Sequence, residues 1–163
     1  MTGFKEFGNW DGILKMTARM PREIQQVNRK SLQKIALKTE RETVLTLRNQ
    51  SQGWVPLNPD YLARKIAQGK SEKILIATTT YIQSITSRQT GNEAFAGVLR
   101  NAKSKDGEDL ASIAMVHEFG SIARGIPARP LWVPVSKKIR SFVLGTNFFG
   151  NEVLNFLKSK YGQ

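Results

Sequence analysis

The residues with the most chemical potential lie in the stretch MVHEFGSIARGIPARPLWVP, residues 115–134. It holds the only histidine of the chain, His117, directly followed by Glu118. An imidazole beside a carboxylate suits general acid–base catalysis and, with further ligands, zinc binding. The same stretch holds three prolines: Pro127, Pro130 and Pro134. Because prolines stiffen a backbone, the stretch supports two hypotheses, a catalytic site or a rigid surface that positions one protein against another.

The spacing of these groups argues against the familiar active-site motifs. A helical zinc-protease motif needs a second histidine four residues after the first, and that position is Ser121. A serine triad would have to use His117, yet no nucleophile-elbow glycine pattern surrounds a serine. The GKS at residues 69–71 lacks the upstream glycine of a phosphate-binding loop. We therefore expect no catalytic residue, no metal ligand and no cofactor, and a protein that is not an enzyme.

The same residues can build a docking loop. Ile126 and Arg129 each precede a proline, which pushes them toward extended conformations. A stiff loop loses less conformational entropy on binding, and Arg and Trp are typical interface anchors. The alternative, that Trp132 simply fills the core, stays open. Just before the loop, we expect Phe119 to fold back into the core and Gly120 to adopt a left-handed cap conformation.

Hydrophobic spacing predicts the elements that position this stretch. Apolar residues recur three to five positions apart from Pro21 to about Gln50, which predicts an amphipathic helix about 45 Å long. Pro21 suits the first turn of that helix. Further elements are a short helix at 60–68, strands at 73–80 and 95–99, a short helix at 109–119, and a strand or helix at 134–144 whose spacing favours helix.

This order predicts an α+β fold: a long N-terminal amphipathic helix packed on a small, mainly antiparallel sheet, with additional short helices and extended terminal segments. We expect an N-terminal arm at 1–20, a single α+β domain at 21–144, and a helical C-terminal segment at 145–163. No apolar run approaches the roughly 20 residues that span a bilayer, so no membrane segment is expected. The absence of cysteine excludes disulfides and is compatible with a reducing cytosol.

Net charge is the strongest compositional feature. The chain has 25 Lys and Arg residues against 13 Asp and Glu residues, a formal charge of +12. Such a chain is attracted to polyanions, although a basic surface can also be simply solvated. The basic residues around the long helix could face DNA or an acidic partner: Arg29, Lys30, Lys34, Lys38 and Arg41.

Two stretches carry a family resemblance. HEFG followed by IPARP-L resembles the signature of bacteriophage virion morphogenesis proteins, the neck or tail-completion proteins of long-tailed phages such as Mu and lambda. Upstream, WVPLNPDYLARKIAQGKSEKILIATTTYIQSI resembles that family's Trp-x-Pro-Leu … Lys … Leu-Ile … Ser-Ile stretch, so the match covers roughly residues 54–134. The chain departs from the pattern at residues 78–80, three threonines where the family often has Thr-Gly. It departs again at Leu131-Trp132, which replaces Phe-Leu.

The resemblance implies a structural virion protein at the head–tail junction, assembled in the bacterial host cytoplasm. It implies a homohexameric ring that joins the head-closure or connector proteins to the tail terminator or tail tube, around a DNA channel. The stretch would shape a subunit or ring contact through His117, Glu118, Phe119, Gly120, Ile126, Pro127, Ala128, Arg129, Pro130, Leu131 and Trp132. The alternative function is a small basic nucleic-acid-binding protein that uses helix 21–50.

Overall fold

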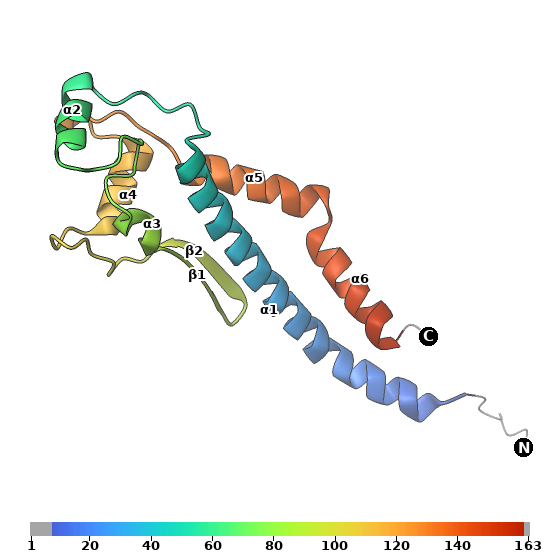
Figure 1. Ribbon diagram of the computed structural model, residues 1–163. Helices are drawn as coiled ribbons and strands as arrows, with labels where there is room; N and C mark the ends of the chain where they lie inside the picture. The colour runs from blue at the N-terminus through green and yellow to red at the C-terminus, as the bar shows by residue number, and fades with distance from the viewer. Residues whose placement is uncertain (1–7, 162–163) are drawn as a thin grey trace, which may run out of the picture.

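The computed structural model describes residues 8–161, and its fold is the expected α+β class. A 40-residue helix, α1 (Trp10–Asn49), extends away from the group formed by α2, α3 and α4 (Figure 1). The other elements, in chain order, are α2 (Pro59–Ala67), α3 (Thr80–Ser84), β1 (Ile85–Thr90), β2 (Glu93–Val98), α4 (Leu110–Phe119), the short 3-10 helix η1 (Ile122–Arg124), α5 (Trp132–Gly145) and α6 (Phe148–Tyr161).

Helix α1 begins well before the proline that was expected to start it. The side chain of Asn9 caps the helix by accepting a hydrogen bond from the Gly12 N–H at 2.9 Å. Pro21 lies inside the helix, on its exposed surface, where water can satisfy the carbonyl that lacks a donor. The described part of the expected N-terminal arm is therefore largely helical, and the rest of that arm lies outside the described residues.

The two strands form an antiparallel hairpin against one side of α1, while α5 and α6 pack along another side (Figure 1). The register pairs Ile85 with Val98 and Thr90 with Glu93, which leaves Gly91 and Asn92 as a two-residue turn. Gly91 has φ 58°, the left-handed region that such tight turns need. The sheet is small and antiparallel, as the sequence predicted.

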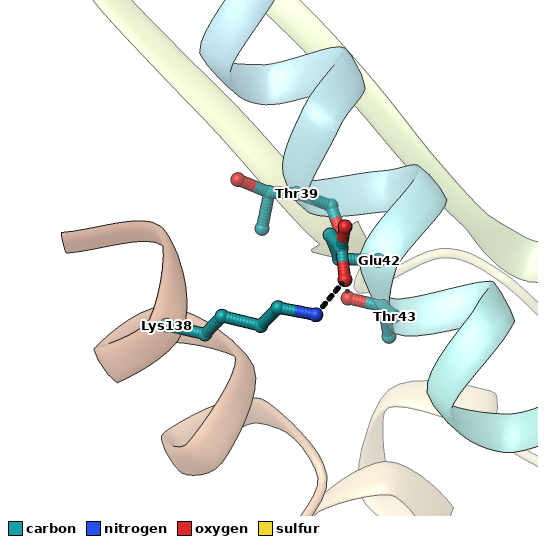
Figure 2. Close-up of polar contacts among 4 residues, drawn as sticks. All are labelled: Thr39, Glu42, Thr43 and Lys138. Carbon is teal, nitrogen blue, oxygen red and sulfur yellow. Dashed lines mark hydrogen bonds and ion pairs between the residues drawn. The ribbon is translucent and has the colours of Figure 1, made fainter. Parts of the chain in front are cut away.

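Apart from Leu47, the fully buried residues of α1 are small. They include Ser31, Ala36 and Thr43, which let neighbouring elements approach the helix closely. Two threonine hydroxyls donate back into the helix: Thr39 to the carbonyl of Ile35, and Thr43 to the carbonyl of Thr39, each at 2.8 Å. Both threonines lie close to the contact with α5 that Figure 2 shows.

Ion pairs hold the C-terminal helices along α1. Lys138 of α5 pairs with Glu42 at 2.6 Å (Figure 2), and Glu152 of α6 pairs with Lys34 at 2.5 Å. Near the end of α6, Lys160 and Tyr161 both donate to Glu23. Each exposed pair contributes little to stability, but together they fix the register of the two helices on α1.

The segment 73–80 is not a strand, so that part of the prediction is wrong. Leu75 has φ 61°, which no strand allows, and Leu75 and Ile76 are both buried although they are neighbours. The Gln50 side chain takes the place of a partner strand: its carbonyl accepts from Ile74 N–H at 2.8 Å and its amide donates to Ile74 C=O at 3.1 Å. The apolar and β-branched residues of this segment indicate burial, not a strand. The backbone of Ile74 is hydrogen-bonded by the Gln50 side chain instead of a neighbouring strand.

Candidate functional site

The carboxylate of Glu118 caps the N-terminus of α5. One oxygen accepts from the N–H groups of Leu131 at 2.7 Å and Trp132 at 2.9 Å, and the other accepts from Val133 at 2.9 Å. The next residue, Pro134, has no N–H, and Val135 is the first to donate within the helix, to Leu131 C=O. One buried side chain from α4 therefore satisfies every free donor at the start of α5.

This cap also has a favourable charge. The N-terminus of a helix carries a partial positive charge, so a buried carboxylate there is stabilised without a cationic side chain. Leu131 occupies the N-cap position of α5, and its side chain makes no capping hydrogen bond. The HEFG and IPARPLWVP segments are thus two halves of one intramolecular joint between α4 and α5.

The turn after α4 depends on Gly120. Its backbone has φ 76°, and a Cβ there would lie 2.8 Å from the Ala128 backbone nitrogen and 2.9 Å from the Ile126 carbonyl oxygen. The loop closes on itself through paired bonds between Ser121 and Ile126, at 2.8 and 2.9 Å. Gly120 has a positive φ, but with ψ −179° it lies outside the left-handed cap conformation that was expected. Close backbone approach is a second reason for glycine at this position.

Arg129 and Trp54 fasten this loop to a distant part of the chain. The guanidinium of Arg129 donates to the carbonyls of Val55 at 2.9 Å and Pro56 at 3.1 Å. In return, the indole of Trp54 donates to the carbonyl of Pro130 at 2.8 Å. The two stretches that carry the family resemblance are therefore bonded to each other in the fold.

His117 and Glu118 do not act on each other, since both carboxylate oxygens are engaged with α5. The His117 Nδ1 is buried without a hydrogen-bond partner among the described residues. The imidazole meets the ring of Tyr81 edge-on, with centroids 6.2 Å apart. Burial, and secondarily the Arg129 cation, lower the pKa of His117; burial raises the pKa of Tyr81 to about 12. Both side chains are therefore neutral near pH 7.

The predicted interface residues fall into two groups. Glu118, Arg129 and Leu131 are buried and Trp132 is half-buried against the core, so these serve the fold itself. The exposed members of the stretch are Phe119, Pro127, Ala128 and Pro130. The partly exposed members are His117, Gly120 and Ile126.

The expectation that Phe119 folds back into the core is wrong, because its side chain is 72% exposed. Ala114 and Glu118 lie on the buried side of the short helix α4, because the Glu118 carboxylate accepts hydrogen bonds from the N-terminus of α5. Phe119 lies next in sequence and points outward. Met115, one turn earlier, and Ile122, just after the turn, are also exposed. These three residues form what we call the apolar tip, which the sequence reading missed in part because it assigned no role to Met115 or Ile122.

The basic residues of α1 are mostly engaged within the chain. Arg29 donates to the Asn92 side chain at 3.3 Å, Lys34 pairs with Glu152, and the Lys38 ammonium lies 4.5 Å from the centre of the Phe142 ring. Lys30 and Arg41 are exposed. The structure thus does not gather the five cations into one free surface.

A large hollow lies beside the loop, between α2, residues 75–81, residues 104–110 and residues 124–127. Its volume is about 1290 Å³. His117, Arg129 and Lys65 contribute to its wall. The sequence did not predict this hollow; the three basic residues of segment 64–70, with no acidic residue among them, are the one signal that was present.

Residues 8–161 contain neither a metal-binding cluster nor a membrane-spanning helix. No group of three or more histidine and acidic side chains there is arranged to hold a metal ion. None of the helices in that range is both long enough and apolar enough to cross a membrane.

Comparison with curated proteins matches an uncharacterized protein of the archaeon Methanocaldococcus jannaschii, MJ0331, which is 34% identical to this chain over 94 residues. The match covers 53% of this chain, and the chain spans only 59% of the relative's length. No family model and no solved structure matches the chain.

Proposed function

We propose that this chain is a structural virion protein of the head–tail junction of a long-tailed phage, a neck or tail-completion protein that forms a ring, expected to be a homohexamer, between the head-closure complex and the tail. One observation carries the proposal. The HEFG and IPARP-L segments, which resemble that family, form a rigid, internally bonded loop directly beside the apolar tip. A rigid loop beside exposed apolar groups is suited to docking against another chain.

The placement of exposed apolar residues favours a ring over a two-fold dimer. A second such group, Trp10, Ile13 and Leu14, lies in the first turns of α1. That end of α1 and helix α4 lie at opposite ends of the molecule (Figure 1). Two different surfaces facing opposite ways suit a head-to-tail contact, which closes into a ring when the rotation per subunit allows it.

The partners in this role are other copies of the chain, head-closure or connector proteins on one side, and tail terminator or tail-tube proteins on the other. Assembly would take place in the host cytoplasm. The role needs no chemical turnover, which agrees with the engagement of both Glu118 oxygens in a helix cap.

The alternative function, a nucleic-acid-binding protein that uses α1 as a basic helix, has less support. The net charge of +12 favours it. However, Arg29, Lys34 and Lys38 already contact other parts of the chain. In a ring, the remaining charge could still contact DNA in the channel without sequence preference.

The proposal is tested by the oligomeric state of the full chain, alone and with the products of the genes that flank it. Light scattering and negative-stain electron microscopy should reveal rings, either of the chain alone or on the neighbouring connector or tail protein. The double variant Phe119→Ser/Ile122→Ser should abolish them and remain folded, because both side chains are exposed. Leu144→Ser, which changes an exposed apolar residue on α5, is the control.

Two results would reject the proposal: monomers under every condition, or rings that the apolar-tip variant leaves intact. Flanking genes for heads, connectors and tails would support it, whereas a metabolic operon would overturn it. Arg129→Ala is a weaker test, because loss of its bonds to the 54–56 segment would also destabilise the fold.

A further inference from the structure

Two buried cations line the hollow beside the loop without an acidic partner. Lys65 is 4% exposed and Arg129 is 6% exposed. The Lys65 ammonium donates to the carbonyl of Lys73 at 2.7 Å, and Arg129 donates only to backbone carbonyls. No carboxylate of the described chain lies within ion-pairing distance of either cation. Buried charges are normally paired with an opposite charge, so a bound anion would be stabilised beside this wall.

The rim of the hollow has the same sign of charge. Its exposed basic side chains are Arg64, Lys70, Lys105 and Arg124. With the two buried cations, six basic side chains line the hollow against three acidic ones, Asp60, Asp106 and Glu108. Burial, together with the nearby Arg129 and Lys70 cations, lowers the pKa of Lys65, so the positive groups also act on one another. An anion placed among them would relieve this repulsion.

The rest of the wall is apolar. Leu75, Ile76 and Tyr81 line it but are buried in the core. The apolar side chains that remain accessible in its lining include Tyr61, Ile113, Ile126 and Pro127. Apolar walls gain free energy by covering apolar side chains, which a nucleic-acid backbone lacks. The phosphates of a duplex are also spaced along an extended rod that favours an open basic surface over a hollow. The lining therefore fits a polypeptide with both acidic and apolar side chains.

We propose that this hollow binds a segment of another protein in which an acidic side chain is flanked by apolar residues. The acidic group would lie among the exposed rim cations, with Arg129 and Lys65 in the wall behind them. The apolar neighbours would cover Tyr61, Ile113 and Pro127, which are exposed or partly exposed. This inference does not require the ring role: the hollow shares Ile126, Pro127 and Arg129 with the loop but none of the three residues of the apolar tip, so either proposal can fail alone.

The test is selection of short random peptides, displayed on phage, against the immobilised full-length chain. Enriched peptides should share an acidic residue with apolar neighbours. Synthetic versions should lose affinity by about tenfold or more when the acid is replaced by its amide, because a charge-assisted hydrogen bond is lost.

Two double variants then locate the site. Lys70→Glu/Arg124→Glu reverses two rim cations whose side chains are exposed, and it should weaken the synthetic peptide by about tenfold or more. Lys30→Glu/Arg41→Glu makes the same charge change on exposed residues of α1 and should leave affinity within about twofold. Circular dichroism spectra should be unchanged in both.

The remaining outcomes overturn the proposal. They are an absence of enriched peptides, enrichment without an acidic residue, or equal loss in the two double variants. A duplex oligonucleotide serves as the competing probe. If it binds and the rim variant alone reduces that binding, the hollow takes phosphate and the proposal for a protein partner is wrong.

Discussion

The Glu118 cap offers the sharpest test of the structure. Replacing this residue by alanine removes the acceptor for three backbone N–H groups at once, those of Leu131, Trp132 and Val133. Replacing it by glutamine keeps the shape but removes the negative charge. It also replaces one carboxylate oxygen by an NH2 group, a donor that would face a backbone N–H of α5. The two variants therefore separate the loss of all three bonds from the loss of charge.

The magnitude follows from the bonds involved. A hydrogen bond to a charged group contributes about 1.5–3 kcal/mol to stability, and buried donors left without partners are costly. The three bonds share one carboxylate and are not additive, so we expect Glu118→Ala to lose about 4 kcal/mol. For Glu118→Gln we expect a loss of about 2 kcal/mol. Since domains unfold with about 5–15 kcal/mol, the alanine variant should be marginally stable.

The assay is urea unfolding followed by circular dichroism, with the free energy of unfolding taken from the midpoint and slope. Glu72→Ala is the matched control, because Glu72 is exposed and forms no ion pair among the described residues, and its change should stay within about 0.5 kcal/mol. A loss below about 1 kcal/mol for Glu118→Ala would refute the cap as a main support of the loop.

Two further predictions concern the same loop. Because burial lowers the pKa of His117 in the folded chain, the unfolded chain binds a proton first as pH falls through about 6.5, so stability should decline from about pH 7 to pH 5.5 and decline less in His117→Gln. Thermal midpoints at several pH values measure this, and equal slopes would contradict it. Gly120→Ala should lose about 2 kcal/mol or more, because its Cβ would clash with the Ala128 backbone, whereas Gly125→Ala, with φ 62° and open space, should lose about 1 kcal/mol. Equal losses in urea unfolding would show that strain in φ, and not close approach, governs Gly120.

Much of the fold could be predicted from local pattern. The apolar spacing after Pro21 predicted a long helix, and the helix at 109–119 was predicted almost to the residue because Asp109 caps it and Gly120 ends it. The antiparallel character of the sheet was also predicted. The strand β1 was missed because ITSRQT is polar and only its first residue, Ile85, is buried. Its strand character depends on pairing with β2 across a turn, which local apolar content does not reveal.

The candidate site shows the same division. The sequence by itself determined that the stretch around His117 is stiff, that its glycine needs a positive φ, and that standard catalytic spacings are absent. Only the tertiary structure decided which side chains are free. Glu118, Arg129 and Leu131 turn inward and Phe119 turns outward, because a carboxylate is needed where the donors of α5 converge. The hollow is likewise a product of packing: Lys65 and Arg129 are 64 positions apart in the chain, and no local pattern places two distant cations on one wall.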